Sequence, residues 1–316
     1  MSHEPYRMVI VRINDWDEFY VLASWFLNDV GQWVFRGQKK VEWELATTLE
    51  RESKKQKSTR KGKSQFVTLD EYLRSRPHSN EVEQIETFKA LTQWDHYMGE
   101  HKLPYLAAMQ HYGFPTRLLD FTHSLFIAAY FAFEDKRSRG DRAVWAIRLD
   151  PVWHYSKAML GIPNDIDDYE VEQRVQSIGD ELIEHEKSRS TSARYGVLPL
   201  INVGDNPRLR AQNGLFLMPF TIDGFRFNLE RAFPKGLDWL YSKDKKAPDG
   251  RYMQFEDYMC LKQKQEVVVM KIVCSRKMKK KAECVFRQMN LTTERLFPDK
   301  SFADVKDSVK YRFWNK

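Results

Sequence analysis

The chain has 316 residues, of which 42% are hydrophobic and 14% aromatic. This composition is too apolar for a disordered protein and allows a large folded core. The formal net charge of +7 and the isoelectric point of about 9.1 favour anionic partners such as nucleic acid, although ordinary surface charge gives the same excess. Three cysteines without CxxC spacing argue against a disulfide framework and a zinc knuckle.

Nothing in the sequence resembles a targeting or membrane segment. The first residues lack an apolar core of the signal-peptide type, and no apolar run approaches the roughly 18 residues of a membrane span. Together with the cysteine pattern, this predicts a cytoplasmic protein without membrane contact.

The first part of the chain predicts a helix, a strand and then a surface excursion. Apolar side chains recur at helical spacing over residues 15–27, with Asn14 or Asp15 as the N-cap. Residues 33–37 have the pattern of a short strand that ends at a glycine. A basic run at 54–63 lies in an expected excursion from about 52 to 77, and it is either a solvated loop or a nucleic-acid contact.

The central part of the chain predicts two helices, a strand, a wholly apolar buried helix and a second strand. These lie at residues 81–97, 104–112, 115–121, 125–133 and 142–149. Gly113 is placed to end the second helix. Between these elements no turn-rich linker separates one domain from another.

The last part alternates charged helices with strands. Residues 150–194 predict one or two surface helices, and strands follow at 215–219 and 266–273. The final helix, at 276–289, starts with a second basic run, 276–281. We therefore expect one α+β domain over 1–316, with a mixed sheet, flanking helices and insertions at about 52–77 and 150–194.

Three polar clusters lie in otherwise apolar segments. In the first, Arg36 stands between Phe35 and Gly37, where it either binds a ligand anion or pairs with a carboxylate such as Asp120. The glycine is expected to let a ligand approach the backbone.

The second cluster is the stretch from Thr116 to Ser124. Strand alternation places Arg117 and Asp120 on different faces, so one of them is expected to anchor structure while the other faces a ligand. Asp120, Thr122 and Ser124 precede the apolar helix, where they either cap it or help present its N-terminus to phosphate.

The third cluster, Asn206 to Gly214, leads into an apolar strand and suits an anionic ligand or a simple polar turn. His111 ends a helix just before the second cluster and serves there as a capping or core histidine or as a base. The histidines do not have metal-ligand spacing, and standard nucleotide and hydrolase motifs are missing, so we expect no metal.

The chain resembles the FRG family, named for its Phe-Arg-Gly motif. The resemblance rests on Trp33-Val34-Phe35-Arg36-Gly37-Gln38 and on the block from Leu106 to Thr122, which contains Met109-Gln110-His111-Tyr112-Gly113 and Leu118-Leu119-Asp120. Further matching pieces follow in the family's order at 128–132, 208–216 and 296–299.

The layout is similar to that of ADP-ribosyltransferases, which cleave NAD⁺ and pass ADP-ribose to a target. This resemblance implies an ADP-ribosyltransferase-like mixed sheet, with Arg36 on the ribose and phosphate, Thr122 and Ser124 near the nicotinamide, and Gln212 near the reacting ribose. Where those enzymes have a catalytic glutamate, this chain has Gly214, so Gln212, Asp120 or another carboxylate takes over or the protein is not a conventional transferase.

The expected function is that of an NAD-dependent mono-ADP-ribosyltransferase. It would be a toxin or anti-phage effector that modifies nucleic acid, with RNA favoured, and it would have a cognate antitoxin. The expected catalytic residues are Arg36, Gln212 and Asp120. The expected NAD contacts are Phe35, Arg36, Gly37, Gln38, His111, Arg117, Thr122, Ser124 and Arg210.

Two other functions compete with this one. A non-catalytic nucleic-acid or nucleotide sensor would use the same residues and the lysine runs, and would show salt-dependent binding. A metal-free nuclease would use His111 and Asp120.

Overall fold

A computed structural model describes ten segments of the chain. They are residues 7–29, 31–51, 81–92, 99–135, 137–184, 194–201, 206–233, 238–239, 253–260 and 267–298. The predicted excursion at 52–77 and its basic run 54–63 lie outside the described residues, as do the end of the helix predicted at 81–97 and Asp299.

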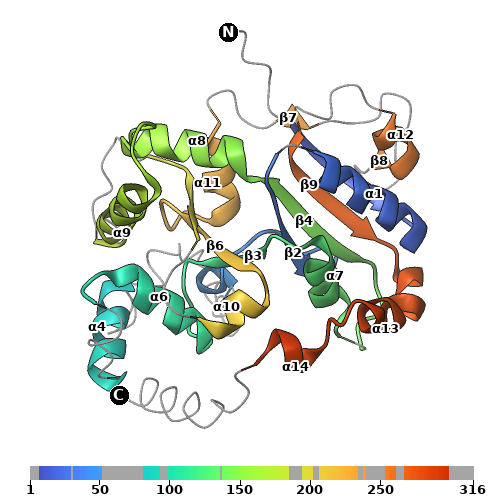
Figure 1. Cartoon of the computed structure of the whole chain (residues 1–316), viewed down its shortest axis with the longest axis horizontal. Helices are drawn as coiled ribbons and strands as arrows, with labels where there is room; N and C mark the ends of the chain where they lie inside the picture. The colour runs from blue at the N-terminus through green and yellow to red at the C-terminus, as the bar shows by residue number, and fades with distance from the viewer. Residues whose placement is uncertain are drawn as a thin grey trace, which may run out of the picture.

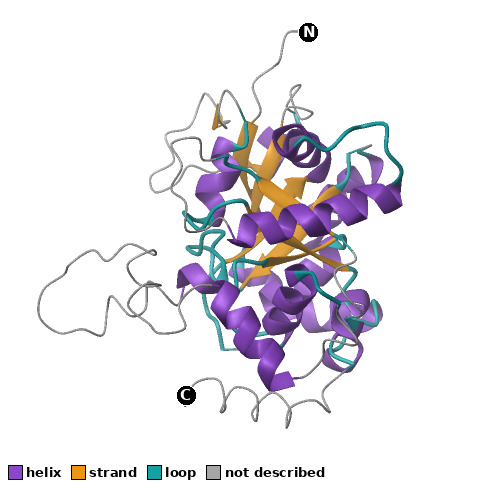
Figure 2. Ribbon diagram, turned by 90° about the vertical axis from the view of Figure 1, so that its left-hand side faces the viewer, coloured by secondary structure: helices purple, strands orange, loops and turns teal. Residues whose placement is uncertain are grey.

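A mixed β-sheet forms the centre of the molecule (Figure 2). Within the described residues its strands are β1 (Arg7–Ile13), β2 (Trp33–Gln38), β3 (Leu119–Thr122), β4 (Arg142–Arg148), β5 (Val197–Leu200), β6 (Gly214–Pro219), β7 (Asp238–Trp239), β8 (Met253–Gln254) and β9 (Val267–Cys274). Their order is β5-β6-β3-β2-β4-β9-β1-β7, and β8 also pairs with β1. Strand β1 runs parallel to β7, β8 and β9, whereas the other pairs are antiparallel.

Helices cover both faces of the sheet. They are α1 (Trp16–Asn28), α4 (Glu81–Thr92), α6 (Lys102–His111), α7 (Leu125–Phe133), α8 (Leu149–Leu160), α9 (Asp168–Glu184), α10 (Pro207–Ala211), α11 (Phe225–Arg231), α12 (Phe255–Met259), α13 (Lys279–Gln288) and α14 (Thr293–Leu296). Figure 1 shows α4, α6 and α9 at one end of the molecule and α1, α12 and α13 at the other. The chain is thus a mixed α+β protein.

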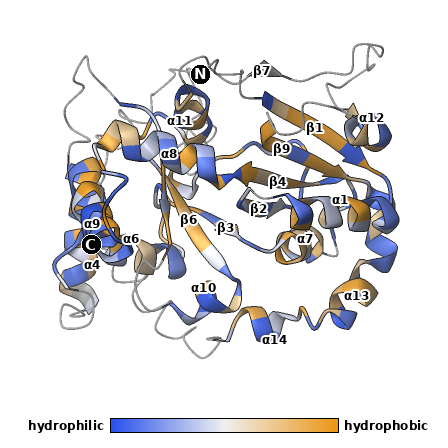
Figure 3. Ribbon diagram, turned by 45° about the horizontal axis from the view of Figure 1, so that its top comes forward, coloured by the Kyte–Doolittle hydropathy of each residue, from blue (hydrophilic) through white to orange (hydrophobic). Residues whose placement is uncertain are grey.

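Three buried clusters fill the space between helices and sheet. On one face, α1, α7 and α13 pack on β1, β2, β4 and β9, and the α4–α6–α9 group packs on β5 and β6. On the opposite face, α8 and α11 cover the sheet. The α7 helix is apolar around its whole circumference, as Figure 3 shows, and most of its residues are buried. Burial on all sides removes this apolar surface from water and fixes α7 tightly on β2.

Most predicted elements are confirmed. The helix predicted at 15–27 is α1, and Asp15 rather than Asn14 caps it by accepting from the amides of Asp17 and Glu18. Two helices, α8 and α9, occupy the charged region predicted at 150–194. Gly113 has a positive φ of 77° after α6, as expected of a residue that ends a helix.

The predicted strand at 115–121 is wrong in its first half, because β3 begins only at Leu119. The preceding backbone has other partners: the Thr116 carbonyl accepts from the Leu49 amide, and the Arg117 amide donates to Glu81. Strands β1 and β5 and helix α11 were not predicted.

No helix in the described part of the chain is both long enough and apolar enough to cross a membrane.

Candidate functional site

The three predicted polar segments come together because β2, β3 and β6 are neighbours in the sheet. Phe35 of β2 is opposite Thr122 of β3, and Thr122 is in turn opposite Gly214 of β6. Segments separated by about a third of the chain therefore form one row across the sheet.

Arg36 lies at the centre of this meeting point. Its Nη1 donates to the Asp120 carbonyl oxygen at 2.7 Å and lies 3.4 Å from the Asp120 carboxylate. Only 17% of the Arg36 side chain is exposed, and its buried Nε has no hydrogen-bond partner among the described residues. Because a buried donor without an acceptor is costly, the guanidinium can accept a further anion or hydroxyl oxygen as partner.

The charge environment of Arg36 is asymmetric. Burial lowers the pKa of Arg36, and Arg51 lowers it further, whereas Asp120 raises it. A guanidinium stays charged in proteins, so Arg36 and Arg51 are both positive. Asp120 is the carboxylate that offsets the charge on Arg36. The local field therefore favours an additional negative charge.

The carboxylate of Asp120 is oriented from the side of α6. Gln110 Nε2 donates to it at 2.9 Å, and Thr116 Oγ1 donates to Gln110 Oε1 at 2.6 Å. This chain of bonds fixes which end of the Gln110 amide faces Asp120. The Asp120 side chain is still 49% exposed and can accept hydrogen bonds from a ligand.

Thr116 was part of the predicted second cluster, whereas Gln110 and Arg51 belong to this site but were not predicted as site residues. Gln110 lies ten residues before Asp120, so its place in the same polar block was a usable signal. Arg51 ends the stretch 45–51, which also resembles the family, but its approach to Arg36 depends on how the segment after β2 folds back.

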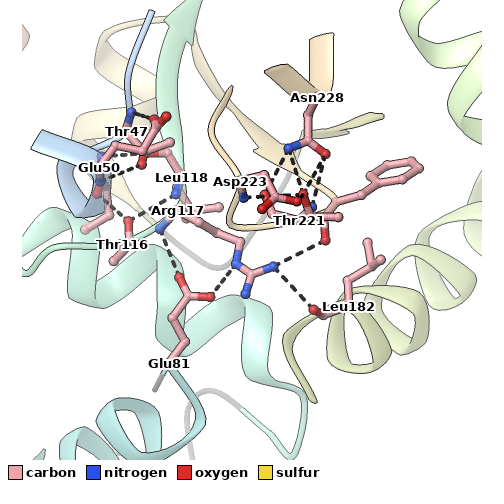
Figure 4. A network of polar contacts seen from close by, with 12 residues as sticks. Thr47, Glu50, Glu81, Thr116, Arg117, Leu118, Leu182, Thr221, Asp223 and Asn228 are labelled. Carbon is pink, nitrogen blue, oxygen red and sulfur yellow. Dashed lines mark hydrogen bonds and ion pairs between the residues drawn. The ribbon is translucent and has the colours of Figure 1, made fainter. Parts of the chain in front are cut away.

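Arg117 does not join the site, which corrects the expectation that it contacts a ligand. It forms a buried ion pair with Glu81, in which the two side chains are 2% and 0% exposed. Its Nη1 also lies near the carbonyls of Leu182 and Phe220, at 3.3 and 3.5 Å. Figure 4 shows the guanidinium enclosed between Glu81 and Leu182. Of the two residues, Arg117 is thus the structural anchor and Asp120 the exposed one.

Gln212 is near the row but its amide points elsewhere. Gln212 Nε2 donates to the Leu296 carbonyl at 3.0 Å, and the Gln212 carbonyl accepts from Thr122 Oγ1 at 2.7 Å. The Gln212 amide is therefore occupied by the segment at α14, and a catalytic role beside Arg36 does not fit this position.

Thr122 and Ser124 prepare the start of α7. Thr122 Oγ1 accepts from the Ser124 amide at 3.0 Å, and Ser124 Oγ accepts from the Ile127 amide at 3.3 Å as the N-cap. The capping interpretation of Ser124 is therefore confirmed. Thr122 joins β3 to the α10–β6 turn instead of capping the helix.

The neighbours of Arg36 in the Phe-Arg-Gly motif serve packing, contrary to the expectation that they contact a ligand. Phe35 is buried against Phe26, with ring centroids 5.0 Å apart. Gln38 is buried as well, where it accepts from Trp145 Nε1 and donates to the Glu44 carbonyl.

Gly37 faces α7 and not open space. A Cβ added to it would lie 1.9 Å from the Ala128 carbonyl oxygen and 2.7 Å from the Ala132 nitrogen. The glycine is thus required because a helix backbone approaches it, and not a ligand.

His111 and Arg210 complete the predicted set. His111 is the last residue of α6, half-buried, with its ring edge against Tyr112 at 5.2 Å. Arg210 is exposed on the short helix α10.

The position at which the resemblance expects a glutamate lies close to Leu209. A Cβ added to Gly214 would lie 2.7 Å from a methyl group of Leu209 and 3.2 Å from its carbonyl, so a side chain there requires Leu209 to move. The carboxylate that lies next to Arg36 is that of Asp120, and it is 49% exposed.

Comparison with known proteins gives one match. No curated protein and no solved structure matches the chain. The family model of the FRG domain matches residues 31–141, a range that contains Arg36, Gln110, Thr116 and Asp120 and ends before Gln212. With the motif residues placed around one polar site, the chain carries an FRG domain over residues 31–141.

Proposed function

We propose that the protein is an NAD-dependent mono-ADP-ribosyltransferase whose acceptor is nucleic acid, with RNA favoured. The observation that carries this proposal is the Arg36–Asp120 pair, in which a buried guanidinium nitrogen lacks a partner beside a half-exposed carboxylate. A pyrophosphate or ribose oxygen suits the first group, and ribose hydroxyls suit the second.

In this proposal NAD⁺ is a substrate. The bond between ribose C1′ and the nicotinamide nitrogen breaks, and its electron pair leaves with nicotinamide. A bond forms between C1′ and an acceptor oxygen or nitrogen, which loses its proton to solvent or to a base. Positive charge develops on the ribose ring during this exchange, and a fixed carboxylate beside it stabilises that charge.

Asp120 takes the place of the missing glutamate in this proposal. It lies on β3 next to Arg36, two residues from Thr122, which is opposite Gly214. Two residues along a strand span about 7 Å, so Asp120 lies in the neighbourhood of the expected glutamate without occupying its position. The mixed sheet with an arginine on β2 and an apolar helix after β3 supports an ADP-ribosyltransferase-like arrangement.

A second candidate is non-catalytic nucleotide binding. It is favoured by the lack of a carboxylate at Gly214 and by the engagement of Asp120 with Arg36 and Gln110. A carboxylate already held by two donors offers less stabilisation to developing charge than an unpaired one. Nucleotide binding without turnover needs only the positive charge of Arg36 and no catalytic carboxylate.

The test is incubation of the full-length protein with NAD⁺ labelled in the adenylate phosphate, together with total RNA, DNA or cell lysate. Label transfer with release of nicotinamide is expected. Arg36→Lys should lower kcat/KM about a hundredfold or more, because a point charge cannot replace a planar two-nitrogen fork. Asp120→Asn should have a loss of the same order.

Arg287→Lys is the matched control, since Arg287 is exposed on α13 in a solvent-screened pair with Glu283 and should leave activity within about twofold of the parent. Thermal unfolding of each variant separates loss of fold from loss of chemistry. Neither NAD⁺ consumption nor label transfer under any of these conditions would rule out the transferase. Salt-dependent nucleotide binding by calorimetry that survives in Arg36→Lys would then support the second candidate.

A role as a toxin or anti-phage effector follows from this chemistry, because an enzyme that consumes NAD⁺ or modifies RNA damages the cell that makes it. We include in the proposal a cytoplasmic location, where both substrates are present, and a cognate antitoxin protein. Induced expression should arrest growth, and Arg36→Lys should remove the arrest at equal protein level.

A further inference from the structure

A second feature lies just beyond Arg36 on the same strand. A hollow of about 370 Å³ is lined by two short stretches, 39–43 and 135–141. Its residues are Lys39, Lys40, Glu42, Trp43, Asp135, Arg137, Ser138, Arg139, Gly140 and Asp141. Three residues of strand span about 10 Å, so the hollow starts within that distance of Arg36 along the backbone.

The walls of the hollow are fastened to each other. Ser138 Oγ donates to the Lys39 carbonyl at 3.1 Å, and the Val41 amide donates to the Asp141 carbonyl at 3.2 Å. From below, Lys271 of β9 donates to the Trp43 carbonyl at 3.2 Å. These bonds hold the two stretches at a fixed separation, so the hollow exists before any ligand arrives.

Aromatic surface and positive charge meet in this hollow. Trp43 is 44% exposed, so part of its ring surface is open to solvent and available for stacking. Lys40 lies 5.8 Å from the centre of the Trp43 ring. Arg137 and Arg139 are exposed, and neither forms an ion pair with another residue in the described part of the chain.

The lining also contains three acidic residues, and each has a partner. Glu42 lies 3.9 Å from Lys40. Asp141 pairs with Arg12 at 2.8 Å and accepts from the Arg276 amide at 2.9 Å, and Asp135 accepts from the Arg137 amide at 2.9 Å. The Arg137 and Arg139 side chains are therefore the positive groups of the lining that are available to an anion.

The second basic run of the sequence borders the same hollow. Lys279 Nζ donates to the Ser138 carbonyl at 3.1 Å, which places the start of α13 against the wall formed by 137–141. The run 276–281 contains five basic residues: Arg276, Lys277, Lys279, Lys280 and Lys281. This second basic run therefore lies beside the wall of the hollow, next to the basic residues of the lining.

We infer that this hollow binds single-stranded nucleic acid, with one base stacked on Trp43 and the flanking phosphates on Arg137, Arg139 and the run 276–281. An aromatic platform within a positive groove is the arrangement that binds unpaired strands irrespective of sequence. A duplex hides its base faces, and an acidic peptide lacks them, so neither uses Trp43. The inference rests on the proposed function in its biological role: the hollow would hold the nucleic-acid acceptor near Arg36.

The experiment is fluorescence anisotropy of a labelled single-stranded RNA of about ten nucleotides, titrated with the full-length protein without NAD⁺. Trp43→Leu should weaken binding about tenfold or more, whereas Trp43→Phe, which keeps an aromatic face, should bind within a few-fold of the parent. Equal binding by the leucine and phenylalanine variants would overturn the stacking role.

The charge contribution is tested by salt dependence. The double variant Arg137→Ala/Arg139→Ala should reduce the slope of log K against log salt by about 1.4, the value for two lost phosphate contacts on a single strand. The matched control is Arg174→Ala/Arg287→Ala, which removes the same charge from exposed positions on α9 and α13 and should leave the slope unchanged. Equal slopes in both double variants would contradict the proposed contacts.

Competitors identify the ligand class. Unlabelled single-stranded RNA and DNA of the same sequence should compete, and their ratio shows whether the 2′-hydroxyl contributes. Competition by duplex or by polyglutamate as strong as that by single strands would overturn the inference. RNA binding is measured without NAD⁺ and label transfer is measured with it, so a failure of this inference is distinguishable from a failure of the transferase chemistry.

Discussion

Arg36 and Arg117 show how the same side chain serves two purposes. Arg117 is sealed against Glu81, while Arg36 has an exposed carboxylate as partner and a buried nitrogen without one. In the buried Arg117–Glu81 pair both charges are removed from water, so each is stabilised only by the other and neither can bind a ligand. Arg36 has a buried nitrogen without a hydrogen-bond partner among the described residues, so it can still bind a ligand.

The sealed pair gives a stability prediction. Glu81→Ala leaves the Arg117 charge buried without its carboxylate and should lower the free energy of unfolding by about 3–5 kcal/mol. The measurement is denaturant unfolding of the full chain. Glu283→Ala is the control, because that residue is 62% exposed in its pair with Arg287 and should change stability by less than about 1 kcal/mol. Similar losses in both variants would show that Arg117 is solvated after the change.

The residue scale also shows what the sequence could reveal about the site. Pairing of Arg36 with a carboxylate such as Asp120 was one of two predicted alternatives, because a guanidinium in an apolar strand needs an acceptor. That one of Arg117 and Asp120 anchors structure was also expected, but from a strand alternation that does not reach Arg117, since β3 begins at Leu119. The orientation of Gln212 was not predictable, since it depends on the carbonyl of Leu296, far along the chain.

At the scale of elements, the closest contact is that of α7 with β2. Gly37 lets the helix backbone approach the strand, and Ser124 caps the helix that makes the approach. The Phe-Arg-Gly motif therefore combines one residue for the site, Arg36, with two for the packing beneath it. A disturbance of α7 moves the strand that carries Arg36.

Gly37→Ala tests this contact. The added methyl group meets backbone atoms, which cannot rotate away, so the free energy of unfolding should fall by about 1–3 kcal/mol or more. Gly140→Ala is the matched control, because nothing lies within 4 Å of its Cβ position, and its stability should stay within about 1 kcal/mol of the parent. If denaturant midpoints of the two variants coincide, α7 is free to shift.

Helices and strands with a clear periodic spacing of apolar residues were predictable from the sequence. Short elements, and strands that depend on distant pairing partners, were not. The helices α1 and α7 and the strands β2, β4 and β9 followed from periodicity and from runs of β-branched residues. Strand β5 is four residues long and contains Pro199, which weakens its signal. Strand β1 has a run of four apolar residues from Met8 to Val11 that was a usable signal, yet its parallel partner β9 lies about 260 residues away in the chain.

At the scale of the whole molecule, pH should act on stability through His123, which lies between the two residues that prepare α7. Burial lowers the pKa of His123 below its usual value of about 6.5. As pH falls, the unfolded chain therefore takes up the proton before the folded chain does. The His123 contribution to stability is complete above about pH 6.5 and is lost as pH falls towards the lowered pKa of the folded state.

His123→Gln should remove this contribution. The difference in free energy of unfolding between parent and variant should be constant above about pH 6.5 and should shift in favour of the variant below it. Denaturant unfolding at a series of pH values measures it. A difference that stays constant through the acidic range would show that His123 has the same proton affinity in both states.

The position of β1 has a consequence for how the protein is made. This strand leaves the ribosome well before its partners β7, β8 and β9, which lie more than about 200 residues further along the chain. Until these strands emerge, β1 lacks them as neighbours, and until β9 emerges one edge of β4 stays open to unwanted pairing. The pairing of β1 into the sheet therefore waits for distant segments, which exposes the nascent chain to wrong pairing in the meantime.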